Sequence, residues 1–445
     1  MNTIVALSTP RGRGAIAVIR LSGPDAIVIA QRLGLNEVAD RRATLTTLTS
    51  PTNNETLDQV LLTCFRAPHS LTGEDVVEIS CHGSPAVVRN IIDTTLELGA
   101  ILAGPGEFTL RALSNGKINL AQAEAIRDLV AAQTDAAVKQ ASRQLHGELS
   151  NALGPLKEKL VEAIVVLESA LEFVEDDLPA VRAHEIETDL ATVSAGVEKL
   201  AKTYAAGRLL QEGIKVTITG RPNVGKSSLF NGLIERERAI VTDIPGTTRD
   251  TLTEVIDLDG IPVILTDTAG LRETTDGIET LGMERTRRAM GDSDLVLVVL
   301  DGSAELGPSD HDLLSHTENS HRLIVRNKSD LPEFAASCLG EPQAINVSAR
   351  TGKGLATLRS SILASLSNNG IEDGSLLITN ARHYDLLRSA QRELDDARAA
   401  LRDRHSEELV LAPLHNALRF LGQITGETTT EDILSGIFAT FCIGK

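Results

Sequence analysis

Gly220-Arg-Pro-Asn-Val-Gly-Lys-Ser227 is a complete phosphate-binding loop of the form Gly-x-x-x-x-Gly-Lys-Ser. A strand-like apolar run, 214–219, precedes it, and a helix-like stretch beginning at Ser228 follows it. In such a loop the glycines let backbone N–H groups face phosphate oxygens, and the lysine, here Lys226, reaches the outer phosphates. The hydroxyl of Ser227 is of the kind that holds Mg²⁺. The loop and its two neighbours together predict an α/β nucleotide-binding domain.

Three segments further along the chain predict that the nucleotide carries guanine. Asp267-Thr-Ala-Gly270 ends an apolar run; its carboxylate can hold Mg²⁺ through water, and its last N–H can sense a γ-phosphate. Asn327-Lys-Ser-Asp330 ends the next run, and its final carboxylate can accept paired hydrogen bonds from the N1–H and N2–H₂ groups of guanine. Ser348-Ala-Arg350 would place backbone N–H groups near the base carbonyl. Any one string is an ordinary turn, but four in order, each ending a strand, predict guanine specificity.

The segment between the phosphate loop and Asp267 reads Val241-Thr-Asp-Ile-Pro-Gly-Thr-Thr-Arg-Asp250 and is rich in turn formers. Such a composition predicts a mobile surface loop, which is also what a switch that orders only on nucleotide requires. One threonine must complete the Mg²⁺ shell when triphosphate is bound. Thr248 is the better candidate, with Thr247 beside it.

The hydrolytic machinery lacks the glutamine that many GTPases use. Many GTPases place a glutamine directly after the Asp-x-x-Gly element to orient the attacking water, and here that position is Leu271. Another group must hold the water, and the nearby acids are Glu273, Glu279 and Glu284, among which the residues alone do not decide.

The developing negative charge between the β- and γ-phosphates also needs a cation. A K⁺ held by the side-chain oxygen of Asn223 and by carbonyls of the 242–247 loop would supply it. Arg249 and Arg272 are either transition-state or cross-subunit groups, or simply solvated arginines.

The two ends of the chain carry longer and more specific segments. They are Thr9-Pro-Arg-Gly-Arg-Gly-Ala-Ile-Ala-Val-Ile-Arg20-Leu-Ser-Gly23, Thr72-Gly-Glu-Asp-Val-Val-Glu78, Gly106-Glu-Phe-Thr-Leu-Arg-Ala-Leu-Ser-Asn-Gly-Lys117 and Phe441-Cys-Ile-Gly-Lys445. With these the chain resembles, over essentially its whole length, the tRNA modification GTPases called MnmE or TrmE. Pro245, where many members have a small residue, and Asn119, in place of a common acid, depart from the family pattern without removing an expected ligand.

The resemblance implies K⁺-stimulated GTP hydrolysis in which the two G domains of a homodimer approach each other. By motif position the K⁺ ligands would be Asn223, Thr242, Ile244 and Thr247, and the Mg²⁺ ligands Ser227 and Thr248. Glu279, aligned by its spacing after Asp267, would orient the catalytic water. The residues expected to contact GTP are Asn223, Val224, Gly225, Lys226, Ser227, Ser228, Thr242, Asp243, Ile244, Pro245, Gly246, Thr247, Thr248, Asp267, Thr268, Ala269, Gly270, Asn327, Lys328, Asp330, Ser348, Ala349 and Arg350.

The resemblance further implies a reduced one-carbon folate, 5-formyl- or 5,10-methylene-tetrahydrofolate, bound by the N-terminal domain. That role would fall on Arg20, Glu78 and Lys117, with Lys445 from the other end of the chain. A flavin-dependent MnmG or GidA partner would join in a heterotetramer or larger complex that installs a 5-carboxymethylaminomethyl-type group on the wobble uridine, U34, of certain tRNAs. Cys442 is either a catalytic thiol or a small buried residue near the folate.

Composition limits which partners the surface can attract. A net charge of −18 argues against whole-surface attraction to nucleic acid. Aromatic residues make up 2% of the chain and tryptophan is absent, which argues against a stacking platform for single-stranded RNA. A tRNA-linked function therefore needs a local basic face or a partner that supplies most of the contact.

The cysteines and apolar runs predict a cytoplasmic protein with no membrane association. Cys64, Cys81, Cys338 and Cys442 are far apart and have no metal-ligand spacing, which fits reduced thiols in the cytosol. No basic region followed by an apolar core stands at the start of the chain, and the longest apolar runs are too short to span a bilayer.

At 445 residues the chain is long enough for two or three domains. Short β-branched runs mixed with helical stretches predict an α+β domain over 1–117, and the resemblance implies that this domain binds folate and forms the dimer. Helical spacing, as in Leu160, Ile164, Leu167 and Leu171, predicts an all-α domain over 118–212 that resumes over 369–445. A Ras-like α/β P-loop GTPase domain over 213–368 would be inserted between these halves, so its first and last segments would lie close together.

A second function remains open at this point: a regulatory switch, such as a ribosome-assembly GTPase, in which nucleotide only changes the affinity for a partner. Its G-domain motifs would be the same. Such proteins usually append a basic RNA-binding domain, which is not evident here. Folate binding by residues 1–117 would distinguish the two.

Overall fold

The structure is a computed structural model that describes residues 2–35, 39–172, 180–234, 252–267, 290–334, 344–366, 376–427, 434 and 437–444. The chain folds into two compact units. The first comprises Met1–Arg127, Gln144–Ile164 and Leu411–Lys445, and the second comprises Asp128–Arg143 and Val165–Val410. The boundaries fall within helices, so each unit is assembled from separate stretches of sequence.

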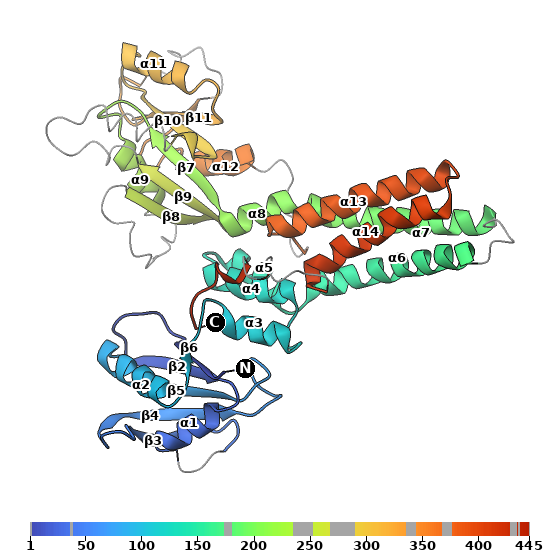
Figure 1. The fold of residues 1–445 in the computed structure, drawn as a ribbon. Coiled ribbons are helices and arrows are strands. Elements are labelled where there is room, and N and C mark those ends of the chain that lie inside the picture. Colours follow the sequence, from blue (N-terminus) through green and yellow to red (C-terminus); the bar gives the residue numbers. More distant parts are fainter. Residues whose placement is uncertain are drawn as a thin grey trace. The chain divides into compact units, whose positions relative to one another are not determined.

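The first unit contains a sheet with the strand order β3-β4-β5-β2-β1-β6 (Figure 1). Its pairs are antiparallel except for β1 with β6. The strands are β1 (Ile4–Leu7), β2 (Ile16–Ser22), β3 (Thr44–Thr49), β4 (Thr56–Phe65), β5 (Val76–His82) and β6 (Ile101–Leu102). Side chains alternate between the two faces, and one face packs against helices α1 (Ala26–Arg32) and α2 (Pro85–Glu97). This is the α+β architecture that the sequence predicts.

The other face of this sheet is covered near β1 by helix α3 (Glu107–Ser114), whose Phe108 is fully buried beside Ile4 and Ala6. The C-terminal segment returns to this region. Pro105 forms an isolated β-bridge with Ile443, and the Ser8 hydroxyl donates to the Gly444 carbonyl at 3.1 Å. The two termini of the chain therefore contribute to the same part of the first unit.

Helices make up most of the remaining chain outside the nucleotide domain. They are α4 (Leu120–Ala131), α5 (Asp135–Leu145), α6 (Glu148–Glu172), α7 (Ala180–Lys202), α8 (Tyr204–Glu212), α13 (Ala381–Arg402) and α14 (Glu407–Thr425). Leu160, Ile164 and Leu167 are buried along one side of α6, as their spacing predicts. Among the described helices, none is both long enough and apolar enough to cross a membrane.

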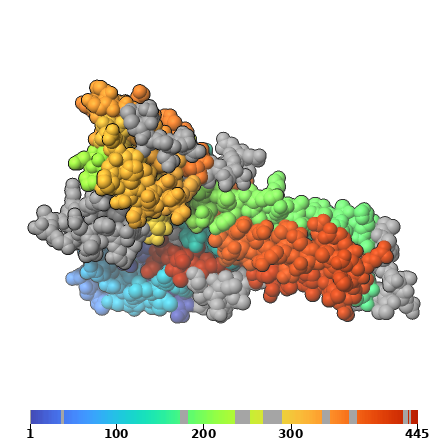
Figure 2. Space-filling model, turned by 90° about the horizontal axis from the view of Figure 1, so that it is seen from above, coloured from blue at the N-terminus to red at the C-terminus, as the bar shows by residue number. Residues whose placement is uncertain are grey.

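Helices α7 and α13, which flank the nucleotide domain in sequence, lie side by side (Figure 1, Figure 2). Their contact is partly polar: Gln391 Nε2 donates to Ser194 Oγ at 2.6 Å, and Arg398 pairs with Glu187 at 3.1 Å. Helices α7 and α13 therefore pack together within the second unit, although the nucleotide domain separates them in the sequence.

The nucleotide domain has a sheet with the order β12-β11-β10-β7-β9-β8, in which only β8 is antiparallel to its neighbour. The strands are β7 (Ile214–Thr219), β8 (Leu252–Leu258), β9 (Ile261–Asp267), β10 (Leu295–Asp301), β11 (Arg322–Asn327) and β12 (Ile345–Asn346). Helices α9 (Lys226–Ile234) and α12 (Leu355–Leu366) pack on one face, and α11 (Pro308–His316) packs on the other. Layers of helix on both faces of a mainly parallel sheet are the predicted α/β fold.

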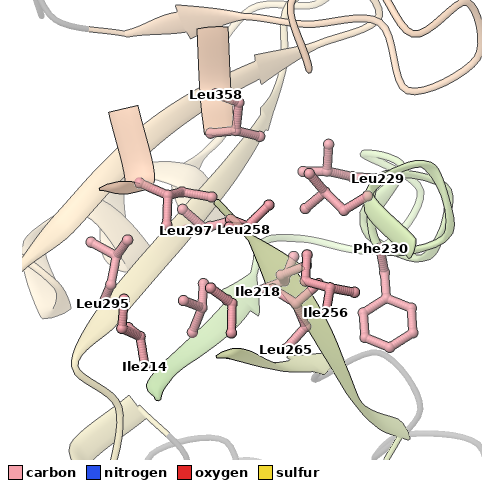
Figure 3. Close-up of a cluster of buried hydrophobic side chains, with 14 of the residues drawn as sticks. Ile214, Ile218, Leu229, Phe230, Ile256, Leu258, Leu265, Leu295, Leu297 and Leu358 are labelled. Atoms are coloured by element: carbon pink, nitrogen blue, oxygen red, sulfur yellow. The ribbon is translucent and has the colours of Figure 1, made fainter. Parts of the chain in front are cut away.

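The position of β10 in the middle of the sheet explains why residues 295–300 form an unbroken apolar run. Leu295 and Leu297 belong to the cluster shown in Figure 3, together with Ile218, Leu229 and Leu358. The alternate residues of β10, such as Val298, face the opposite side and pack near α11. A central parallel strand covered on both faces must be apolar at every position.

The segments that precede and follow the nucleotide domain in the sequence lie together. The backbone N–H of Ile378 donates to Thr203 Oγ1 at 2.9 Å, and a Cβ at Gly207 would collide with the Ile378 carbonyl. Gln140 of α5 donates to the Leu377 carbonyl at 2.7 Å. The prediction of a GTPase domain inserted into a helical domain is confirmed.

Candidate guanine nucleotide site

Four segments meet at one edge of the nucleotide-domain sheet. Strands β7, β9, β11 and β12 run parallel, so their carboxyl ends reach the same edge. The segments that follow or end these strands are 220–227, Asp267, 327–330 and 348–350. These are the four motifs on which the sequence-based prediction of guanine specificity depends.

The phosphate-binding loop has the backbone that its glycines permit. Gly225 has φ +94°, and a Cβ there would collide with the side-chain nitrogen of Asn327. Asn223 also has a positive φ, 65°, a conformation that asparagine tolerates better than most residues. Helix α9 begins at Lys226, two residues before the predicted start, so this lysine belongs to the first turn. Its ammonium is nearly buried and donates to the Arg221 carbonyl at 3.0 Å.

Two oxygen ligands suited to Mg²⁺ lie together beside this loop. The Ser227 hydroxyl donates to Asp267 Oδ2 at 2.9 Å, and Asp267 is fully buried at the end of β9. A hydroxyl and a carboxylate are hard oxygen donors of the kind that Mg²⁺ prefers. The described residues at this point therefore fit the predicted ion.

Asn327 connects three of the four segments. Its Nδ2 donates to the Val224 carbonyl in the phosphate loop at 2.8 Å, and its Oδ1 accepts from the Ala349 N–H at 2.9 Å. The side chain is 3% exposed. The sequence predicts Asn327 only as a nucleotide contact, and this bracing role depends on a separation of 103 residues that no local pattern reveals.

The carboxylate expected to read guanine is already oriented. The Ser348 hydroxyl donates to Asp330 Oδ1 at 2.7 Å, and this hydrogen bond is the main reason that the pKa of Asp330 lies below its usual value. Ser348 Oγ in turn accepts from the Thr351 N–H at 3.1 Å. Asp330 is therefore ionised at neutral pH and can accept the N–H groups of guanine.

Several predicted site residues lie outside the described residues, and the structure places none of them. They are the switch-loop residues Thr242, Asp243, Ile244, Pro245, Gly246, Thr247 and Thr248, the segment Thr268, Ala269 and Gly270, the candidate acids Glu273, Glu279 and Glu284, the arginines Arg249 and Arg272, and the terminal Lys445.

The residues implied for folate binding are partly assembled in the first unit. Arg20 on β2 lies opposite Glu78 on β5, and its Nε and Nη2 both reach Glu78 Oε1, at 3.0 and 2.8 Å. Arg20 Nη1 also lies 3.4 Å from the Gly444 carbonyl. Lys117 donates to the Pro68 carbonyl at 2.7 Å and is exposed. The structure therefore brings Arg20, Glu78 and the C-terminal segment together, and it directs the Lys117 ammonium to a backbone carbonyl.

Comparison with known proteins extends the likeness to the whole chain. The family model described as the MnmE helical domain matches residues 120–442, and the model described as the GTP-binding protein TrmE N-terminus matches residues 3–117. The tRNA modification GTPase MnmE of Koribacter versatilis is 46% identical over 450 residues, which cover 100% of this chain and 99% of that protein. The chain belongs to the MnmE family. The MnmE protein of Aquifex aeolicus is 41% identical over 447 residues, with 99% of each chain covered.

Solved structures overlap with a smaller part of this MnmE family member. The G domain of the T. maritima FeoB iron transporter is 27% identical, covers 35% of this chain and 99% of its own, and gives a TM-score of 0.28.

Proposed function

We propose that this chain is a K⁺-stimulated GTP hydrolase that acts as a homodimer with a flavin-dependent MnmG/GidA-type protein. Together they would introduce a 5-carboxymethylaminomethyl-type group at the wobble uridine, U34, of certain tRNAs. Membership of the tRNA modification GTPase family supports the enzyme class and the tRNA pathway. The observation that carries the hydrolase assignment is the single sheet edge on which the phosphate loop, Asp267, Asn327 and Ser348 meet.

GTP would lie along this edge, with its phosphates over residues 223–228 and its base at Asp330. Ser227 and, from the switch loop, Thr248 would hold Mg²⁺, and Lys226 would leave the Arg221 carbonyl for the outer phosphates. Mg²⁺ supplies positive charge that stabilises the transferring phosphoryl group when it is bound. The Ser227–Asp267 contact supports this placement because both oxygens already converge beside the loop.

K⁺ would supply the charge that an arginine finger supplies elsewhere. Asn223 lies in the phosphate loop, is exposed and has a positive φ of 65°, so its side-chain oxygen is accessible to an ion from solvent. Thr242, Ile244 and Thr247 are the remaining proposed ligands, and Glu279 is proposed to orient the water because Leu271 cannot.

The N-terminal unit would bind the one-carbon folate. Glu78 is held through Oε1 by Arg20, which leaves Oε2 able to accept N–H groups of a pterin. In this arrangement Arg20 orients Glu78, and Lys117 and Lys445 are the cations available to the glutamate tail. The bound folate would supply the one-carbon unit. These contacts support the proposed site through the chemistry of its donors and acceptors.

A second copy of the chain would cover the open face of the N-terminal sheet. Leu45 and Leu61 lie directly opposite each other on β3 and β4, and they are 64% and 48% exposed. An apolar cross-strand pair facing solvent is typical of a contact surface.

The proposed domains are 1–117 for folate binding and dimerisation, 118–212 and 369–445 for the helical domain, and 213–368 for GTP binding. We also propose that the protein is cytoplasmic.

The test is a GTPase assay of the full chain in K⁺ and in Na⁺ at equal ionic strength, repeated over a range of protein concentrations. We expect turnover per chain to be much higher in K⁺ and to rise with concentration as dimers form. Equal turnover in both salts at every concentration would remove the K⁺ site and the G-domain pairing from the proposal. Titration calorimetry with 5-formyltetrahydrofolate tests the second part, because a regulatory switch without this chemistry would give no heat of binding.

A further inference from the structure

Among the described parallel strands of the nucleotide domain, β7, β9, β11 and β12 each lead into a nucleotide motif. Strand β10 is the one whose carboxyl end carries no such motif. It lies between β11 and β7 in the sheet. The segment that follows it, from Asp301 to Asp310, therefore leaves the sheet between the base-binding loop after β11 and the phosphate-binding loop after β7. This position allows one segment to contact both loops.

Asp301 ends β10 and binds the base-side loop. The Lys328 ammonium donates to Asp301 Oδ2 at 2.6 Å, while the N–H and hydroxyl of Ser303 both donate to Oδ1, at 3.0 and 2.6 Å. The side chain of Asp301 is 12% exposed. The next residue adds a backbone link, since the Gly302 N–H donates to the Asn327 carbonyl at 2.9 Å.

Desolvation would by itself raise the pKa of Asp301, but the hydrogen bonds from Lys328 and Ser303 outweigh it and hold the pKa below its usual value. The carboxylate is therefore charged at every pH at which the domain would work. Lys328 has a positive φ of 67°, so the backbone of the base loop is bent at the residue that Asp301 holds. The ion pair thus fixes a bend two residues before the carboxylate of Asp330.

Asp310 binds the phosphate-side loop from the other end of the same segment. It is 1% exposed, and its Oδ2 accepts from the Gly307 N–H at 3.0 Å at the start of α11. The Arg221 Nε lies 3.3 Å from the same oxygen, as an ion pair without hydrogen-bond geometry. Oδ1 of Asp310 is buried and accepts no hydrogen bond from the described residues, so the buried carboxylate is compensated by the Gly307 N–H and by the cation of Arg221, both at Oδ2.

The Arg221 backbone connects this ion pair to the chemistry. Its carbonyl accepts from the Lys226 ammonium, the group that reaches the outer phosphates in the proposed function. A change in the position of the Arg221 backbone would therefore move the Lys226 ammonium before nucleotide binds.

We propose that Asp301 and Asp310 are positioning residues for guanine nucleotide binding: Asp301 sets the base loop through Lys328, and Asp310 sets the phosphate loop through Arg221. The proposal rests on the proposed function, because it concerns the same nucleotide site. Neither aspartate contacts the nucleotide in this arrangement. Asp301 acts through Lys328, a residue of the Asn-Lys-Ser-Asp motif, and Asp310 acts through Arg221, which occupies a variable position of the phosphate-binding loop.

The two pairs predict different losses of selectivity. Inosine diphosphate lacks the N2 amine, so it makes one fewer contact with Asp330 than GDP does. If Asp301 sets the base loop, its loss should weaken the binding of GDP more than the binding of inosine diphosphate. If Arg221 sets only the phosphate loop, its loss should weaken the binding of both nucleotides by the same factor.

The experiment measures dissociation constants of the full chain for GDP and for inosine diphosphate by competition with a fluorescent GDP. For Asp301→Asn we expect the GDP constant to rise about tenfold, and the preference for GDP over inosine diphosphate to fall about fivefold, as for loss of one partner of a partly buried charge pair. For Arg221→Met we expect both constants to rise about fivefold with the preference unchanged. Asp312→Asn on α11 and Lys215→Met on β7 are matched controls, since both residues are exposed and make the same change of charge.

Arg221→Met tests the pairing with Asp310 without changing Asp310 itself, so the hydrogen bond from the Gly307 N–H that caps α11 is retained. Equal loss of GDP and inosine diphosphate binding in Asp301→Asn would overturn the role of Asp301, since general destabilisation has that signature. Constants within twofold of wild type in Arg221→Met would overturn the role of Asp310. A wild-type chain that binds neither nucleotide would instead overturn the proposed function, and this inference with it.

Discussion

Asn327→Ala is the substitution whose effect follows most directly from the structure. The side chain is buried and joins the Val224 carbonyl of the phosphate loop to the Ala349 N–H beyond β12. Alanine removes both hydrogen bonds and leaves a carbonyl and an N–H without this partner. A buried group left unsatisfied costs about 1–3 kcal/mol, and the Ala349 N–H is only partly buried. We therefore expect the nucleotide domain to lose about 2–4 kcal/mol of its free energy of unfolding.

The same substitution should reduce nucleotide affinity, because the base-side and phosphate-side loops lose their direct link. A cost of about 1.4 kcal/mol in holding these loops corresponds to a tenfold rise in the dissociation constant for GDP. Asn327→Asp separates the two bonds, since it retains an acceptor for Ala349 but presents a carboxylate to the Val224 carbonyl. We expect Asn327→Asp to be at least as destabilising as alanine above pH 5.

The assay is denaturant unfolding of the full chain with and without GDP. Because a multidomain chain does not unfold in one two-state step, the relevant transition is the one that GDP shifts. Asn346→Ala is the matched control: this asparagine is exposed on the neighbouring strand β12, and its loss should change the free energy by less than about 0.5 kcal/mol. A change equally small in Asn327→Ala, with GDP affinity unaltered, would refute the bracing role.

Further predictions concern the hydrolytic acid, the folate site and the thiols. Glu279→Ala should abolish GTP turnover while leaving GTP affinity nearly intact in an equilibrium binding assay; if Glu273→Ala has this effect instead, the proposed acid is wrong. Glu78→Gln should weaken 5-formyltetrahydrofolate binding in calorimetry without changing the GTPase rate, and unchanged affinity would contradict the placement of that site. Burial raises the pKa of the Cys81 thiol to about 11. At pH 8 roughly one Cys81 in a thousand is therefore a thiolate, so iodoacetamide should label exposed Cys442 far faster in a peptide-resolved mass spectrum, and equal labelling of the native chain would contradict this burial.

The sequence predicted the nucleotide domain well because its signals are local. A strand, a glycine-bearing loop and a helix follow one another between residues 214 and 234, and the apolar run of β10 is long enough to require burial on both faces. The error was at a boundary: α9 begins at Lys226 and not at Ser228. A glycine with positive φ directly before Lys226 ends the loop there, and a pattern of apolar residues does not detect such a turn.

The pairings within the sites were beyond the reach of sequence patterns. Arg20 meets Glu78 because β2 and β5 pair in one register, and a shift by one residue would put the two side chains on opposite faces of the sheet. Asp301 and Asp310 belong to no motif, so nothing in the sequence distinguishes them from solvated aspartates. Their roles became visible only when the strand order placed β10 between the two nucleotide loops.

Strand β9 has a nucleotide motif at its carboxyl end and a contact with the helical segment α5 next to its amino end. The nucleotide motifs stand at the carboxyl ends of β7 and β9, whereas the Gly260 carbonyl, in the turn before β9, accepts from Thr134 Oγ1 at 2.7 Å at the start of α5. Strand β9 spans seven residues, or roughly 20 Å, between that turn and Asp267. Because a paired strand is stiff along its length, a displacement of Asp267 during hydrolysis would reach the α5 contact as a movement of the whole strand. In the proposed function hydrolysis contributes no atom to the modified base, so this connection would carry the change at Asp267 to the helical segment at α5.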